Sequence, residues 1–163
     1  MIRLIIDTYG GSHNDIFVII DSSPWQIKIV DSFFLFNFLE ISDTELSDLN
    51  LSGEQSLKYG VTALLNYWVN RIKSIETGQV KFIPFDLSDQ YVGGFWLKKV
   101  KNNFKLQLVW TKDIEGHSIG KSTLDKRISD DKLIFSESES GEWLISEEGL
   151  YNGLDWSIKE ISK

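Results

Sequence analysis

The most regular pattern of apolar positions lies in the middle of the chain, between residues 53 and 77. Apolar residues recur there at steps of three and four, which places them on one face of an α-helix. Ser52 can cap the N-terminus of this helix, with Gln55 as its reciprocal partner, and Gly78 can take the left-handed conformation that ends a helix. The expected buried stripe consists of Leu57, Val61, Leu64, Trp68, Ile72 and Ile75.

On the N-terminal side of this helix the pattern indicates short strands. Residues 1–7 and 16–21 are β-rich, and the turn-forming segment 9–15 between them makes a β-hairpin the simplest interpretation. Residues 25–30 alternate apolar and polar, which fits either a third strand or the start of a helix. Residues 32–41 are apolar nearly all round, so periodicity cannot assign them.

On the C-terminal side of the helix the period changes to two, which predicts β-structure. The clearest half-buried strand alternates Phe104, Leu106, Leu108 and Trp110 against Lys105, Gln107, Val109 and Thr111. Gly141 is expected to turn a further hairpin between residues 133–135 and 143–145, and residues 150–161 fit a helix or a strand. The other strands are expected at residues 80–85 and 91–100.

This order of elements predicts an α+β fold. Antiparallel-looking runs of strands on either side of one long helix differ from the alternation that builds parallel sheets. We therefore expect an antiparallel sheet of about five to seven strands with the long helix packed against it. The length of 163 residues, without linkers, repeats or low-complexity stretches, predicts a single α+β domain over residues 1–163.

Composition excludes several kinds of chemistry. The chain contains no cysteine, which removes disulfides, thiolate zinc sites and cysteine nucleophiles from consideration. The apolar run at residues 1–6 is shorter than the core of a signal peptide, and no run approaches the roughly 20 apolar residues that span a bilayer. We expect a cytoplasmic protein that does not enter a membrane.

Charge is the more informative property. The net charge of -7 argues against a nucleic-acid partner and suits attraction to a basic one. Acidic residues concentrate at 40–54 and 130–148, whereas residues 96–112 carry five lysines and no acid. The acid-rich segments are either binding surfaces or solvated loops, and the lysines either meet a partner or protect an exposed strand edge.

Candidate catalytic and metal-binding motifs are weak. The segment Gly116–Ser122 resembles a phosphate-binding loop, but it has three residues between its glycines where that loop needs four. His13 lies near Asp7, Asp15 and Asp21, a set that could bind a metal or supply a base, but a solvated turn is the preferred interpretation. The expectation is therefore no catalytic residue, no metal site and no cofactor.

One string in the second half of the chain is distinctive. Residues 82–94 read Phe-Ile-Pro-Phe-Asp-Leu-Ser-Asp-Gln-Tyr-Val-Gly-Gly, a turn with two acids and an amide between two strands. This string, in a small, acidic, cysteine-free α+β chain, resembles immunity proteins of bacterial contact-dependent and other polymorphic toxin systems. The resemblance implies a protein that binds and blocks a cognate toxin domain, commonly a basic nuclease.

These observations favour a binding protein over an enzyme. The partner-binding candidates are Asp86, Asp89 and Tyr91, in the turn beside Pro84, and Glu137 and Glu139 in the second acid-rich segment. The two aspartates could instead only bond the backbone of their own turn. The alternative function is a small hydrolase that uses carboxylates or a histidine, and a regulatory module without a dedicated partner is a third interpretation.

Overall fold

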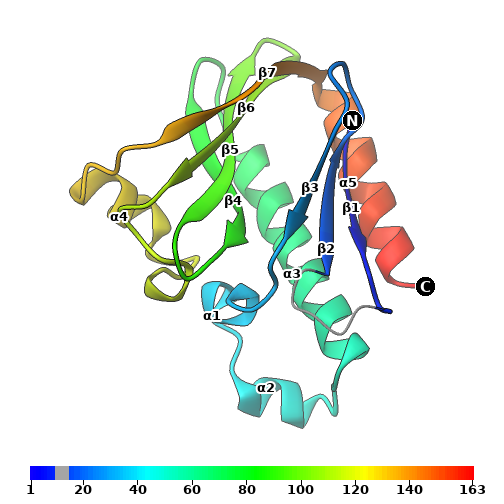
Figure 1. Cartoon of the computed structure of the whole chain (residues 1–163). Helices are drawn as coiled ribbons and strands as arrows, with labels where there is room; N and C mark the ends of the chain where they lie inside the picture. The colour runs from blue at the N-terminus through cyan, green and yellow to red at the C-terminus, as the bar shows by residue number, and fades with distance from the viewer. Residues whose placement is uncertain (10–14) are drawn as a thin grey trace.

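The computed structural model describes residues 1–9 and 15–163, with every side chain of these residues except that of Ser140. Its described strands form two antiparallel sheets, which confirms the predicted α+β class. The expected single sheet is divided in two, of three and four strands, and the long helix lies behind both (Figure 1).

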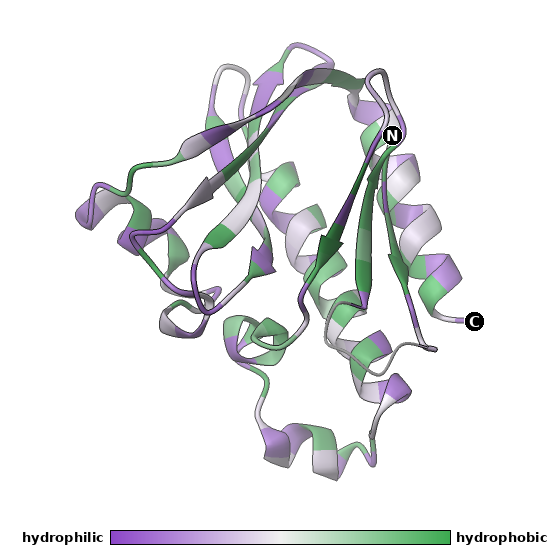
Figure 2. Ribbon diagram, in the orientation of Figure 1, coloured by the Kyte–Doolittle hydropathy of each residue, from purple (hydrophilic) through white to green (hydrophobic). Residues whose placement is uncertain are grey.

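Sheet A is formed by β1 (Ile2–Ile6), β2 (Ile16–Ile20) and β3 (Gln26–Val30). The predicted hairpin of the first two strands is confirmed, although part of its turn falls on residues 10–14, outside the described residues. The ambiguous third run is a strand, paired with β2. Figure 2 shows hydrophobic residues along all three strands of this sheet.

The central helix α3 (Glu54–Lys73) confirms the strongest prediction, since the stripe residues Val61, Leu64 and Trp68 are buried. The predicted cap is wrong: Gly53 occupies the N-cap with φ 53°, and only the backbone carbonyl of Ser52 accepts a bond, from the Gln55 amide. The helix also ends earlier than expected. Gly78 does have a positive φ of 89°, but its amide bonds the Lys99 carbonyl, so it serves the turn into the next strand.

Two segments that periodicity could not assign, residues 32–41 and 150–161, contain helices. Residues 32–41 contain the short helix α1 (Leu35–Leu39), and the first acid-rich segment contains α2 (Asp43–Asp48). The C-terminal segment forms α5 (Glu147–Ile161), capped by the Ser146 side chain. It packs along β1, where the buried Ser157 hydroxyl accepts the Leu4 amide at 2.9 Å and covers the free edge of that strand.

Sheet B has the order β4 (Val80–Leu87), β5 (Val92–Val100), β6 (Asn103–Thr111) and β7 (Ser136–Ser146). The predicted hairpin around Gly141 is wrong, because residues 136–146 form one strand. Gly141 has φ 89° and lies where the register of β7 slips against β6, so it accommodates an irregularity instead of a reversal. The 3₁₀ turn η1 (Gly116–Ser118) and the helix α4 (Leu124–Asp130) lie between β6 and β7.

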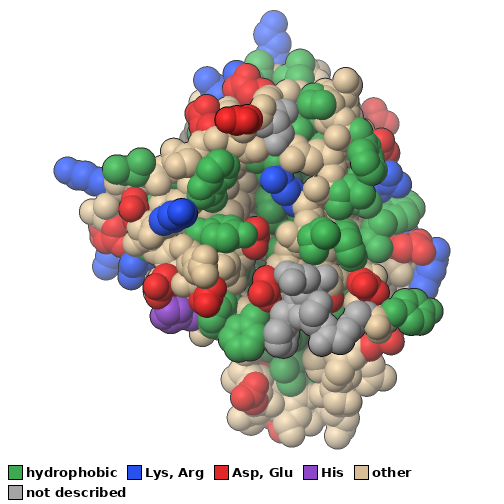
Figure 3. Space-filling view, in the orientation of Figure 1, with side chains coloured by type: hydrophobic (Ala, Val, Ile, Leu, Met, Phe, Trp, Pro, Cys, Tyr) green, Lys and Arg blue, Asp and Glu red, His purple; other side chains and the backbone are tan. Residues whose placement is uncertain are grey.

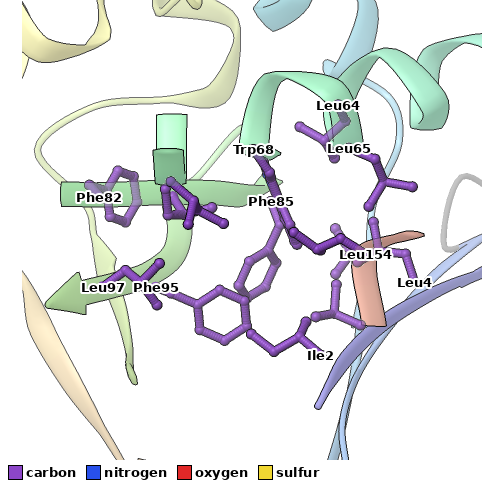
Figure 4. Packing of buried hydrophobic residues seen from close by; sticks show 14 of the residues in the cluster. Ile2, Leu4, Leu64, Leu65, Trp68, Phe82, Phe85, Phe95, Leu97 and Leu154 are labelled. Atoms are coloured by element: carbon purple, nitrogen blue, oxygen red, sulfur yellow. The ribbon is translucent and has the colours of Figure 1, made fainter. Parts of the chain in front are cut away.

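Buried residues of both sheets and of α3 and α5 form one apolar cluster. Trp68 of α3 meets Phe85 and Phe95 of sheet B edge-on, while Leu4 of sheet A and Leu154 of α5 close the other side (Figure 4). The sheets converge where the Trp143 indole bonds the Pro24 carbonyl at 2.7 Å, and they diverge toward α1. Within the described residues, no helix is long and apolar enough to cross a membrane.

Candidate functional site

A groove of about 370 Å³ opens between the two sheets where they diverge. Its walls come from β3 on one side and from all four strands of sheet B and the residues that follow them on the other. This arrangement brings together residues that are far apart in the sequence. The groove is lined by Lys28, Phe85, Asp86, Gln90, Tyr91, Gly93, Gly94, Leu108, Val109, Trp110, Lys112 and Ser138.

A β-bulge places Asp86 in this groove. Pro84 pairs with Gly94 and Asp86 pairs with Gly93, so Phe85 has no partner of its own on β5. Strict alternation would put Phe85 and Asp86 on opposite faces of the sheet. The extra residue lets both face inward, because a bulge shifts the alternation by one position. Phe85 joins the core against Phe95, with ring centroids 4.7 Å apart, and Asp86 enters the groove.

Asp86 and Tyr91 form a hydrogen-bonded pair within the groove. The Tyr91 hydroxyl donates to Asp86 Oδ2 at 2.8 Å. Burial raises the pKa of the Asp86 carboxyl above its ordinary value, while the bond from Tyr91 acts in the opposite direction. Burial and the same bond raise the pKa of Tyr91 to about 12. The turn backbone is instead bonded by Ser88, whose hydroxyl accepts the Gln90 amide at 3.1 Å.

The other candidate residues lie outside this pair. Asp89 is exposed in the β4–β5 turn, where its carboxylate accepts from the Ser88 hydroxyl at 3.2 Å. Glu137 and Glu139 are exposed on β7 and are not part of the groove lining, and Glu137 accepts from the Gln107 amide at 3.0 Å. The structure therefore brings two of the five residues together and leaves the other three outside the groove lining.

Part of the acid-rich charge is balanced within the chain. Glu142 and Glu147 pair with Lys105 and Lys99 at 2.6 and 2.9 Å, so the lysine-rich and acid-rich segments meet in sheet B. In the first acid-rich segment, Glu45 accepts from the hydroxyl of Tyr59 at 2.7 Å. The acids that stay exposed without such a partner are the stronger candidates for external contacts.

The outer face of sheet A carries apolar side chains that none of the described helices covers. Ile5, Phe17 and Ile29 form one cross-strand row, and Ile27 is paired with Ile19 in the next. Ile27 is 40% exposed, Ile29 is 59% exposed, and Figure 3 shows apolar side chains gathered over these three strands. We call these five isoleucine and phenylalanine residues the outer face. The alternation of residues 25–30 indicated that this strand has one apolar face. It did not indicate which of the two faces lies toward the core.

Acidic residues border one end of the outer face. The Asp7 amide bonds the Asp15 carbonyl at 2.7 Å, which continues the β1–β2 ladder, and Asp31 follows β3 at the same end. Asp31 also lines a small hollow with Asp89, Phe33 and Phe34. This acidic end, formed by Asp7, Asp15, Asp31 and Asp89, therefore joins sheet A to the β4–β5 turn of sheet B.

The loop that resembles a phosphate-binding loop and the histidine His117 show no arrangement of a binding or catalytic site in the described residues. In the segment that resembles a phosphate-binding loop, the Glu40 carboxylate accepts the Ser122 amide at 3.1 Å and is also bonded by the Ser122 hydroxyl. An acidic side chain of the same molecule thus takes the backbone donor that an anion would need. His13 lies outside the described residues, and His117 is exposed beside Glu115 at 3.3 Å. The described residues contain no cluster of three or more potential metal ligands.

Comparison of the chain with protein-family models, with curated proteins and with solved structures found no match. The groove, the outer face and the acidic end are the features of the structure that bear on its function.

Proposed function

We propose that this protein is a binding protein of the immunity type, which holds and neutralises a basic toxin domain on the outer face of sheet A. The observation that carries the proposal is the uncovered apolar surface of that sheet. A contiguous exposed apolar patch is unusual on a soluble protein and is typical of an interaction site.

The composition of the surface supports a protein partner. Exposed large apolar side chains at the centre and charged side chains at one end correspond to the apolar core and polar rim of a protein interface. Trp25, which precedes β3, is 63% exposed and supplies an aromatic anchor of the kind that dominates binding energy. The acidic end and the net charge of -7 favour a partner with a basic surface.

The test uses a purified candidate partner, the C-terminal domain of the protein encoded by the neighbouring reading frame. Ile29→Ser is expected to weaken binding about tenfold or more, since it removes an apolar contact from the centre of the face. The matched control is Leu144→Ser, because Leu144 is 66% exposed on β7 of the other sheet. The control is expected to bind like the parent protein.

The acidic end has its own test. Asp89→Ala is expected to slow association and to reduce the dependence of the on-rate on salt, because steering by opposite charges acts on encounter. Thermal unfolding of the same variant shows whether Asp89 only supports its turn. Binding lost in proportion to folded protein would contradict the contact role, and so would an Ile29→Ser variant that binds with parental affinity.

The alternative of a small hydrolase draws on Asp86 and the histidines. Asp86 and Tyr91 share a groove, but the lining of that groove includes no histidine, and His117 lies beside Glu115. Turnover of a small substrate by the purified protein, with no partner recovered from the native host, would favour this alternative over the binding function.

A further inference from the structure

Lys28 lies on the face of sheet A that packs against the core. It stands in one cross-strand row with Leu4 and Val18, both of which are fully buried. Lys28 is half-buried at the edge of the sheet and lines the inter-sheet groove. Within the described part of the chain it makes no ion pair or side-chain hydrogen bond. Its ammonium is therefore available to pair with an anionic group that enters the groove.

Asp86 lines the same groove with the opposite charge. Its carboxyl is bonded by the Tyr91 hydroxyl and lies within the electrostatic influence of both Asp31 and Lys28, but it forms no ion pair with Lys28. Two complementary charges that face one cavity but do not meet leave room for a molecule between them. A ligand that carries both a carboxylate and an ammonium can satisfy the two together.

The space beside Asp86 has an aromatic wall. Asp86, Gly93 and Trp110 are direct cross-strand neighbours on β4, β5 and β6. Gly93 has no side chain, and a Cβ there would lie 3.1 Å from Asp86 Cβ and 3.6 Å from the Tyr91 ring. The glycine therefore keeps open the gap between a carboxyl group and the indole of half-buried Trp110. A flat apolar group can lie in this gap against the indole.

From these positions we infer that the groove binds a free α-amino acid with an aromatic side chain. Its carboxylate meets Lys28, its ammonium meets Asp86, and its ring lies against Trp110. The volume of about 370 Å³ is at the lower end of the range for small-molecule sites and suits a single small ligand. This binding activity is separate from the proposed function, because it uses the groove instead of the outer face.

Calorimetry with three related probes tests each charge of the ligand. L-Tryptophan has both charged groups, tryptamine lacks the carboxylate, and indole-3-propionate lacks the ammonium. L-Tryptophan is expected to bind at least about tenfold more tightly than either analogue, since a hydrogen bond to a charged group contributes about 1.5–3 kcal/mol, a factor of tenfold or more.

Two variants assign the charges to residues. Lys28→Met is expected to bind L-tryptophan no better than tryptamine, and Asp86→Asn to bind it no better than indole-3-propionate. The matched control is Lys98→Met, because Lys98 is exposed on β5 and does not line the groove. Circular dichroism and thermal unfolding confirm that each variant is folded before its affinity is compared.

The inference is overturned if L-tryptophan does not bind at about 10 mM, which corresponds to less than about 3 kcal/mol of binding free energy. It is equally overturned if the three probes bind alike or if Lys28→Met keeps the parental preference. The Ile29→Ser variant separates the two functions, because it is expected to bind L-tryptophan normally even where it loses the protein partner.

Discussion

Replacement of Gly153 by alanine sets two opposing effects against each other in α5. Alanine is the better helix former, by about 1 kcal/mol in an exposed helix interior. Gly153, however, is buried where α5 packs along β1, and an added Cβ would lie 2.1 Å from the carbonyl oxygen of Ile2. Carbon and oxygen atoms in such contacts are usually about 3.3–3.6 Å apart, so the helix would have to move by about 1 Å.

The structure indicates that the clash outweighs the propensity. Overpacking of this kind costs about 1–3 kcal/mol. The shift would also disturb the Ser157 hydroxyl, which donates to the Gly153 carbonyl at 2.8 Å and accepts the Leu4 amide at 2.9 Å. A buried amide left without an acceptor costs about 1–3 kcal/mol more. After subtraction of the helix-propensity gain, we expect Gly153→Ala to lower the free energy of unfolding by about 3 kcal/mol.

Chemical denaturation measures this change, and a loss of that size would lower the melting temperature by about 6–12 °C in a protein of this length. The control is Asn152→Ala, the neighbouring exposed position of the same helix, which is expected to be neutral or stabilising by a few tenths of a kcal/mol. A Gly153→Ala variant as stable as the parent would refute the close packing of α5 on β1.

Two further perturbations test the core and the surface electrostatics. Trp68→Ala is expected to lower the free energy of unfolding by about 3–5 kcal/mol, because it leaves a cavity in the core and removes the indole donor that lies 2.9 Å from the Pro84 carbonyl. A loss below about 1 kcal/mol in chemical denaturation would show that Trp68 does not lie on the buried face of α3. Hydrogen bonds from Arg71, one of them at 2.9 Å, hold the pKa of the Asp125 carboxyl below its ordinary value of 3.8. The ionised carboxylate therefore stabilises the fold above pH 3.8, and stability measured against pH should show the deficit of Asp125→Asn shrinking as the pH falls below that value.

The long helix and the strands of sheet B could be predicted because each repeats one period over many residues. The stripe from Val61 to Ile72 is buried, and Phe104, Leu106 and Leu108 are buried at alternate positions of β6, because local geometry alone dictates the spacing. Residues 150–161 satisfied both periods. As a helix, this segment packs Gly153 and Ser157 against the edge of β1, about 150 positions earlier in the chain, and these contacts favour the helix over a strand.

The candidate site was predicted only in part, for a related reason. The string around Asp86 and Tyr91 contributes to the lining of the groove, but the direction of Asp86 depends on the unpaired Phe85, which alternation does not reveal. Alternation placed Lys28 and the apolar residues Ile27 and Ile29 on opposite faces of their strand, without indicating which face lies toward the core. An isolated strand has two equivalent faces, and only the position of α3 and α5 behind sheet A decided which of them is covered.

The sequence by itself determined the fold class, the place of the main helix, the net charge of -7 and the absence of cysteine chemistry. These properties depend on residue types and on spacing within one segment. Tertiary structure alone decided the division into two sheets, the groove between them and the uncovered face of sheet A. Those features arise from contacts between segments that are distant in the sequence. The free energy of such a contact depends on both surfaces, so the pattern of one segment alone does not predict it.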